Sequence, residues 1–234
     1  MNKNNVWFIT TKTNLHVGNE NTSSFGLIDL AVQRNATTGL PCINSSSLKG
    51  ALNEYAAKEA KLESNQLIKI FGSDKVKENG KSRNSDTQKG LFTFFDANIL
   101  FLPMQSATQL YELVTCEAVL TRFINQVKLL TGESLDKEAV KKTFGCTKEI
   151  SNEEFENQCS DDNLPVIARN VLENGESKNL WYEQVVPAEA VFYTIIDDKG
   201  DRTLAEKISD NKAIVQIGAN ATIGYGYCKF TTLK

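Results

Sequence analysis

The sequence has a single histidine, few prolines and no long apolar run. Its 234 residues include one histidine, His16, and four prolines. A metal site built from several histidine ligands is therefore excluded, and any Ser-His-Asp triad would have to use His16. No apolar run reaches the roughly 18 residues of a membrane-spanning helix, and the N-terminus lacks the apolar region of a signal peptide. We expect a cytoplasmic protein with no membrane partner.

The five cysteines lack the spacing of a metal site. They are odd in number, widely scattered and without a CxxC pair. This pattern argues against both a zinc ribbon and a disulfide framework. We interpret the cysteines as small buried hydrophobic residues in a reducing compartment.

An excess of positive charge is also missing. The formal net charge is −3, whereas proteins that bind phosphate backbones usually carry a basic bias. If this chain binds a nucleic acid, we expect weak binding unless partner proteins help. A hydrophobic content of 41% with 24% charged residues is otherwise typical of a soluble globular protein.

The order of strand and helix patterns predicts an α+β fold. We expect one domain over residues 1–234 with a single RRM-like (ferredoxin-like) core. Strands are expected over 5–15, 90–102, 191–196 and 214–232, and helices over 48–62, 66–71 and 117–130. Three insertions interrupt the core: a long loop over 18–40, a polar, mobile loop over 74–89, and a projecting two-stranded arm over 160–187. The acidic stretch 144–162 gives no clear pattern, whereas Asn174-Gly175 in the arm is a strong hairpin signal.

The run IGANATIGYGYCKF near the C-terminus contains Gly218, Gly224 and Gly226. Glycines of this kind permit positive φ, and rows of free N–H groups in such loops bind anions, including phosphate. A glycine-rich hairpin without a ligand explains the run equally well.

Three serines precede the helix expected from residue 48. Ser45, Ser46 and Ser47 are followed closely by Lys49. Capping of the helix by Ser46 or Ser47 would explain the serines alone. The alternative is a phosphate cradle, in which the helix N-terminus and Lys49 bind an anion.

Three further side chains are candidates for chemistry. Asp29 is a carboxylate among apolar neighbours; such a residue either faces solvent or caps a turn, or it takes part in the chemistry. Arg34 could pair with it or bind a phosphate, and His16 could be structural or transfer a proton.

The arm carries several large apolar side chains. Trp181 and Tyr182 on the arm, with Phe192 after it, are interpreted as packing residues. Val166 and Ile167 could instead wedge between stacked bases, as apolar side chains do in other nucleic-acid complexes.

Several segments together resemble the RAMP-superfamily CRISPR proteins. They occur in the same order as in that family and span nearly the whole chain: TNLHVG, GLIDLAVQRNATTGLP, SSSLKGAL, FFDANILFLP, VTCEAVLTRF, LWYEQVVPAEAVFY and QIGANATIGYG. Among these proteins the sequence is most similar to the repeated backbone subunit of type III-B (Cmr) RNA-guided effectors.

This resemblance implies a function and its residues. Such subunits polymerise along a CRISPR guide RNA beside other Cmr-type subunits, grip the guide backbone, and kink the guide–target duplex with projecting thumbs. An aspartate in the loop after the first strand cuts the single-stranded target RNA at each kink, with Mg²⁺ or another divalent cation. The match assigns cleavage and metal binding to Asp29, and guide contacts to Ser45, Ser46, Ser47, Lys49, Gly218, Asn220 and Gly224.

The sequence also departs from the family pattern. Asn44 and Ala219 stand where relatives often have glycine, which is tolerated if neither backbone adopts positive φ. Three alternatives remain: a non-catalytic guide-binding scaffold, the related Csm-type backbone subunit, and a standalone nuclease that processes guide precursors.

Overall fold

The computed structural model of the chain describes residues 1, 3–18, 28–73, 77–78, 81–82, 88–210 and 212–232. The loops expected over 18–40 and 74–89 lie partly outside the described residues. Within the part of the chain that is described, no helix is long and apolar enough to cross a membrane.

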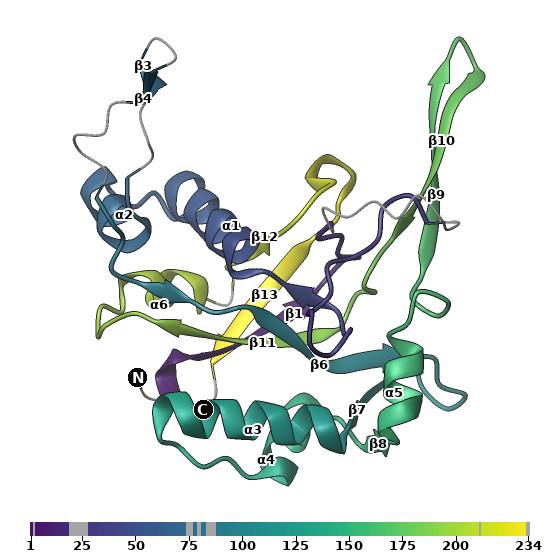
Figure 1. Ribbon diagram of the computed structural model, residues 1–234, viewed down its shortest axis with the longest axis horizontal. Coiled ribbons are helices and arrows are strands. Elements are labelled where there is room, and N and C mark those ends of the chain that lie inside the picture. The colour runs from purple at the N-terminus through teal and green to yellow at the C-terminus, as the bar shows by residue number, and fades with distance from the viewer. Residues whose placement is uncertain are drawn as a thin grey trace.

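Helices and strands are interspersed along the chain (Figure 1). The helices are α1 (Ser45–Lys58), α2 (Ser64–Phe71), α3 (Glu117–Thr131), α4 (Lys137–Phe144), α5 (Asn152–Gln158) and α6 (Thr203–Ile208), with short 3₁₀ turns at Lys3–Asn5 and Ala221–Ile223. The strands are β1 (Val6–Thr11), β2 (Cys42–Ile43), β3 (Lys77–Glu78), β4 (Lys81–Ser82), β5 (Thr93–Phe94), β6 (Ala97–Met104), β7 (Glu112–Cys116), β8 (Lys148–Ile150), β9 (Val166–Glu173), β10 (Glu176–Gln184), β11 (Val191–Asp197), β12 (Val215–Gln216) and β13 (Tyr227–Thr232).

Most strands join one central sheet. Its order is β12-β13-β1-β11-β6-β7-β8, with β2 also paired to β6 and β5 to β11. Within this sheet β7 and β8 pair in parallel, and the other pairs are antiparallel. The prediction of an α+β fold is therefore confirmed at the level of a mixed protein with a mostly antiparallel sheet.

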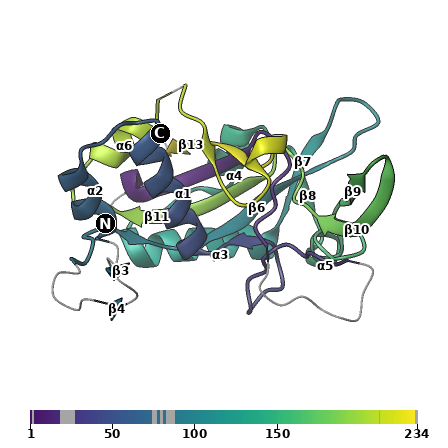
Figure 2. The same cartoon turned by 90° about the horizontal axis from the view of Figure 1, so that it is seen from above.

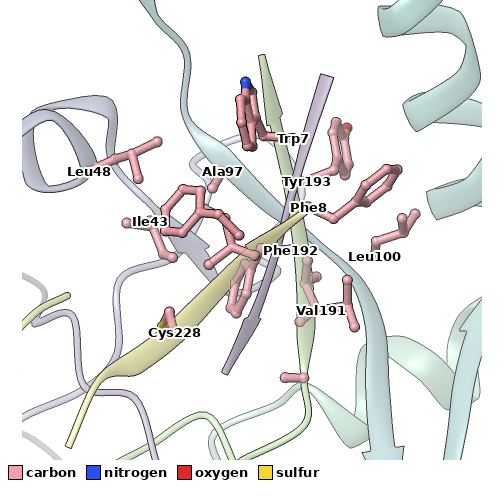
Figure 3. Packing of buried hydrophobic residues seen from close by; sticks show 14 of the residues in the cluster. Trp7, Phe8, Ile43, Leu48, Ala97, Leu100, Val191, Phe192, Tyr193 and Cys228 are labelled. Atoms are coloured by element: carbon pink, nitrogen blue, oxygen red, sulfur yellow. The ribbon is translucent and has the colours of Figure 1, made fainter. Parts of the chain in front are cut away.

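Helices cover both faces of this sheet. Helices α1, α2 and α6 lie above it in Figure 1, and α3 and α4 lie below. Phe8 of β1 meets Phe123 of α3 at 5.7 Å between ring centroids and Phe144 of α4 at 4.7 Å. Figure 3 shows Phe8 and Tyr193 on one side of the strands and Leu48 on the other. Because β1 is covered on both faces, its residues form a continuous apolar run rather than an alternating one.

Strands β9 and β10 form the arm that the Asn-Gly signal predicts. Asn174 and Gly175 have φ of 53° and 84°, the left-handed geometry that a two-residue hairpin turn requires. The two strands make a separate sheet that projects away from the central sheet in both views (Figures 1 and 2). The hairpin is therefore attached to the body by its base.

Helix α1 differs from its prediction at both ends. It begins at Ser45 rather than residue 48 and ends at Lys58, before Lys61, whose φ of 52° interrupts the expected helix. A new helix, α2, then starts from a capping box made by Glu63 and Gln66.

The stretch 144–162, which gave no pattern, contains the end of α4, then β8 and α5. Helices α4 and α5 are both capped by side chains: Asp136 accepts from Ala139 N–H, and Ser151 from Glu154 N–H. These helices are short and strongly charged, so their apolar periodicity is too weak to identify from sequence. Helix α6 was also missed, because it is too short to show a helical period.

All five cysteines are free and buried, as predicted. Burial raises the pKa of the Cys228 thiol to about 12, so this sulfur stays protonated at neutral pH.

Candidate nucleic-acid interface

Asp29 lies at the base of the β9–β10 hairpin. Its backbone N–H donates to the carbonyl oxygen of Tyr182 at 3.0 Å, and its Oδ2 accepts from the Tyr182 N–H at 2.8 Å. The following residue, Leu30, forms a parallel bridge with Glu183. These contacts fix the aspartate against β10 while its side chain stays exposed to solvent. Its second oxygen has no hydrogen-bond partner among the described residues, and an exposed carboxylate of this kind can accept a proton or bind a cation.

Glu183 is the centre of a buried polar cluster under the hairpin base. Its side chain is 2% exposed and accepts a 2.8 Å hydrogen bond from Arg169 Nε. It also accepts from Asn220 Nδ2 and lies 3.6 Å from His16 Nδ1. Since a buried carboxylate is stable only when it is paired and hydrogen-bonded, these partners hold three segments of the chain together.

Arg169 completes this cluster on the hairpin side. Its guanidinium carbon lies 4.7 Å from the centroid of the Tyr225 ring, a cation–π contact. One of its terminal nitrogens, Nη2, is buried without a hydrogen-bond partner in the described part of the chain. The hairpin is thus joined to the C-terminal loop by charge as well as by packing.

His16 faces the interior rather than solvent. The residue is 4% exposed, and its Nδ1 lies 2.7 Å from the carbonyl oxygen of Gln184. Because a carbonyl only accepts, Nδ1 carries the hydrogen in this contact. The backbone of His16 in turn accepts from Ala219 N–H at 2.9 Å. The histidine therefore bridges the end of β10 and the glycine-rich segment.

The glycine loop, residues 217–226, packs against His16 and Val17 in the segment that follows β1. A Cβ at Gly218 would lie 2.2 Å from the His16 carbonyl oxygen, and one at Gly226 would lie 1.9 Å from that of Ile217. Both residues have positive φ, so close approach and backbone conformation each require glycine. Asn220 and Gly224 also adopt left-handed backbone, whereas Ala219 and Asn44 do not. The two departures from the family pattern therefore fall where glycine is not needed.

Gly218→Ala is expected to destabilise the protein more than Gly224→Ala. At Gly224 a Cβ meets nothing within 4 Å, so alanine costs only the left-handed strain of about 1–2 kcal/mol. At Gly218 the clash with backbone adds to that strain. Urea unfolding of the two variants measures the difference, and equal midpoints would contradict the packing described for this loop.

The serines lie in the first turn of α1, not before it. The N-cap residue is Asn44, and its side chain makes no capping hydrogen bond, so the prediction of capping by Ser46 or Ser47 is wrong. Ser45 N–H donates to Asp96 Oδ1 at 2.7 Å. Helix geometry leaves the N–H groups of Ser46 and Ser47 without intrahelical carbonyl partners. Lys49 follows half-buried, with no ion-pair partner among the described residues.

Helix α1 and the glycine loop line one groove. This groove has a volume of about 570 Å³; its lining includes Ala51 and Tyr55 from α1 and Gln216, Ala221 and Tyr227 from the C-terminal region. Ser47 lies four residues before Ala51, on the same face of the helix. The groove thus joins the middle of α1 to Ala221 of the glycine loop, and its lining includes none of the predicted phosphate contacts.

The groove does not carry a positive field. Its lining includes the carboxylates of Glu54, Glu59 and Asp210 and the ammonium groups of Lys58 and Lys212. Lys58 is already paired with Glu54 at 2.6 Å. An anion at this end of the molecule would depend on N–H and hydroxyl donors near the helix start.

Arg34 is bonded within the protein, to segments other than the glycine loop. Its guanidinium donates to the carbonyl oxygens of Gly39 and Cys159 at 2.8 and 2.7 Å and to Asp161 Oδ1 at 2.7 Å. Asp161 also accepts from Gln184 Nε2 at 3.2 Å, which links Arg34 to the hairpin base. A phosphate at Arg34 would have to share these donors.

Val166 and Ile167 lie at the base of the hairpin, not at its tip. They pair with Gln184 and Glu183, one residue from the position that holds Asp29. Val166 is 39% exposed, and Ile167 is half-buried.

Sequence reasoning missed Glu183, Arg169 and Tyr225. Glu183 follows three large residues in LWYEQVV and carries no local mark of burial. Its importance arises from partners 14 to 167 residues away, which no spacing rule connects. Groups of three or more His, Cys, Asp and Glu side chains that could hold a metal do not occur among the described residues.

Comparison with known proteins adds independent information. The RAMP superfamily pattern matches residues 8–229. The CRISPR system Cmr endoribonuclease Cmr4 of Pyrococcus furiosus is 27% identical, with 94% of this chain and 92% of that protein aligned.

Two solved structures share the fold. A chain of the type III-B Cmr-beta complex bound to cognate target RNA superposes with a TM-score of 0.70 at 21% identity, covering 96% of this chain and 95% of that one. Oligomeric Cmr4 from Pyrococcus furiosus gives 0.65 at 23% identity, covering 97% and 96%. Because the family pattern covers nearly the whole chain, this protein belongs to the RAMP superfamily.

Proposed function

We propose that this chain is a guide-RNA-binding backbone subunit of a type III-B CRISPR effector and cuts target RNA at regular intervals in antiviral defence. The observation that carries this proposal is the fixed position of Asp29, an exposed carboxylate held by backbone hydrogen bonds at the base of a projecting hairpin. The similarity of this chain to a Cmr endoribonuclease supports the same function.

The core is proposed to be RRM-like. Strands β13, β1, β11 and β6 are neighbours in that order, and along the chain they are the fourth, first, third and second strands of a βαββαβ unit. In an RRM, bases stack on the open sheet face. Here α3 and α4 cover that face, so RNA is proposed to bind at the α1 start and the loops instead.

The guide backbone is proposed to lie between the start of α1 and the glycine loop. The N–H groups of Ser46 and Ser47 and the serine hydroxyls would donate hydrogen bonds to phosphate oxygens, with Lys49 beside them. Gly218, Asn220 and Gly224 shape the facing loop by their positive φ. Apart from Lys49, this arrangement uses neutral donors, which agrees with a chain of net charge −3.

The hairpin is proposed to be the thumb that opens the duplex. Val166, exposed at its base, would wedge beside a base pair next to Asp29, and Ile167, half-buried on the opposite face, would support it. A displaced base frees its sugar to align the 2′-hydroxyl with the adjacent phosphate, which A-form geometry disfavours. Such alignment supplies much of the rate enhancement in reactions of this kind.

Asp29 is proposed as the general base. Its carboxylate accepts the proton of the 2′-hydroxyl, and the 2′-oxygen attacks the adjacent phosphorus. The bond from phosphorus to the 5′-oxygen breaks, and the leaving oxygen takes a proton from water. The products are a 2′,3′-cyclic phosphate and a 5′-hydroxyl. His16, being buried, is proposed to hold the glycine loop rather than to exchange a proton with RNA.

A divalent cation such as Mg²⁺ would need ligands from both Asp29 and the RNA phosphates. Mg²⁺ commonly uses one or two carboxylates plus substrate phosphates, and Asp29 supplies one carboxylate. The cation would neutralise charge that develops on the phosphate. Cleavage is therefore expected to stop in EDTA while the target stays bound. An unchanged rate in EDTA, measured by single-turnover assay, would exclude a metal requirement.

Copies of this chain are proposed to line up along one guide with other Cmr-type subunits. Repetition of one interface that does not close a ring produces such a filament. The oligomeric relative from Pyrococcus furiosus supports self-association.

The test of the proposed function is reconstitution with guide RNA and the other subunits. We expect a target complementary to the guide to be cut at several evenly spaced positions and an unrelated RNA to stay intact. The isolated chain should not process guide precursors. If the target is not cut at evenly spaced positions, the chain is a scaffold and the proposal fails. If the chain alone processes guide precursors, it is a processing nuclease and the proposal also fails.

A further inference from the structure

The two faces of the β9–β10 hairpin differ in charge. Side chains of paired residues share one face of a β-ladder. Among the paired residues, one face carries no charge; its pairs are Val166 with Gln184, Ala168 with Tyr182, Asn170 with Leu180, and Leu172 with Ser177. Lys178, unpaired at the register shift of β10, forms an ion pair with Glu173 of the other face at 3.6 Å. The other face carries the charged residues of the paired set; its pairs are Ile167 with Glu183, Arg169 with Trp181, Val171 with Asn179, and Glu173 with Glu176.

The charged face is packed on the body at its base, but the neutral face is open. Glu183 and Arg169 are 2% and 16% exposed. On the neutral face Val166, Tyr182, Leu180 and Leu172 are 39%, 39%, 53% and 63% exposed. These four side chains form what we call the apolar strip. A two-stranded hairpin in water gains little stability from its own contacts, so exposed apolar residues along it indicate a partner.

Tyr182 is the residue of the apolar strip next to Asp29. Its backbone N–H donates to Asp29 Oδ2, and its carbonyl oxygen accepts from the N–H groups of Asp29 and Leu30 at 3.0 and 3.1 Å. These three hydrogen bonds fix the tyrosine backbone relative to the carboxylate. The Tyr182 hydroxyl makes no hydrogen bond within the described residues, so the ring has no structural anchor at its end.

The chemical character of the apolar strip indicates which part of an RNA it can bind. A face without cations gains nothing from phosphates, whose binding depends on lysine and arginine. Nucleobases offer flat, uncharged surfaces that stack on aromatic side chains whatever their sequence. A strip that starts beside an exposed carboxylate therefore fits bases next to the bond that is cut.

We propose that the Tyr182 ring stacks on the target base adjacent to the scissile phosphate and thereby positions the ribose against Asp29. Leu180 and Leu172 extend the same apolar surface along the displaced strand. This assignment rests on the proposed function and adds a residue that sequence reasoning had interpreted as a packing residue.

The test compares Tyr182→Ala and Tyr182→Phe in the assembled complex with guide and target RNA. Loss of the ring should slow single-turnover cleavage roughly 10- to 100-fold, the range of one stacking contact, with target affinity nearly unchanged. Tyr182→Phe keeps the ring and should cut at the wild-type rate. Tyr111→Ala is the matched control, because this tyrosine is also 39% exposed but lies outside the hairpin.

A spectroscopic readout separates stacking from structural damage. With 2-aminopurine as the target base beside the cut, fluorescence should be quenched in wild type and in Tyr182→Phe and restored in Tyr182→Ala. Unchanged cleavage and quenching in Tyr182→Ala would overturn the proposal. Loss of self-association in that variant, measured by native mass spectrometry, would instead make the strip a protein interface and also overturn it. If Asp29→Ala is inactive while Tyr182→Ala is normal, only this assignment fails.

Discussion

Asp29→Ala is expected to slow target cleavage by roughly 10²- to 10⁴-fold in the assembled complex, the range that a positioned general base contributes. Target binding should persist, because the carboxylate is exposed and, among the described residues, makes a single side-chain hydrogen bond, to Tyr182 N–H. Loss of that bond costs only about 0.5–1.5 kcal/mol of folding stability. Cleavage is measured with end-labelled target at saturating complex, and binding by gel shift.

Asp29→Asn sharpens this experiment. The amide oxygen can still accept from Tyr182 N–H, so the loop keeps its position, but the side chain can no longer take a proton. We expect it to be as slow as Asp29→Ala. Asp162→Asn, a change of the same kind at another exposed aspartate, should be normal. Wild-type cutting by Asp29→Ala would assign cleavage to another subunit and make this chain a scaffold.

Glu183→Ala is expected to destabilise the protein by about 3–5 kcal/mol, the usual cost of removing one partner from a buried ion pair. The change leaves the Arg169 guanidinium without its carboxylate and removes the acceptor of Asn220. The hairpin base and the glycine loop should loosen together. Thermal or urea unfolding of the purified chain measures the effect.

Glu176→Ala is the matched control for this change. It removes a glutamate from the same strand, but that side chain is exposed. Surface substitutions of this kind usually change stability by no more than about 0.5 kcal/mol. If both variants unfold at the same denaturant concentration, the Glu183 cluster does not hold the hairpin to the body.

Local signals in the sequence predict those parts of the structure that depend on local backbone geometry. Asn174-Gly175 predicts the hairpin turn, since few other dipeptides accept positive φ at both positions. The glycine run predicts a loop in which the backbone approaches another segment, and Gly218 and Gly226 meet carbonyl oxygens for this reason. The role of Asp29, in contrast, was predicted from the family resemblance and not from a local signal.

Features that depend on distant partners were not predictable. Glu183 and Asn220 lie far apart in the sequence, and only the folded chain brings them to His16. The start of α1 was misplaced because serines before an apolar residue usually cap a helix, whereas here Asp96 accepts from Ser45 N–H. In both cases tertiary contacts override the local preference.

The most direct test is a cryo-electron microscopy structure of the assembled wild-type complex with guide and a target lacking the 2′-hydroxyl at one cut site. We expect guide phosphates at the N–H groups of Ser46 and Ser47 and beside the glycine loop, with the modified sugar facing the Asp29 carboxylate. A guide bound on another face of the molecule, or a cut site remote from Asp29, would contradict the central claim that one protein surface both holds the guide and cuts the target.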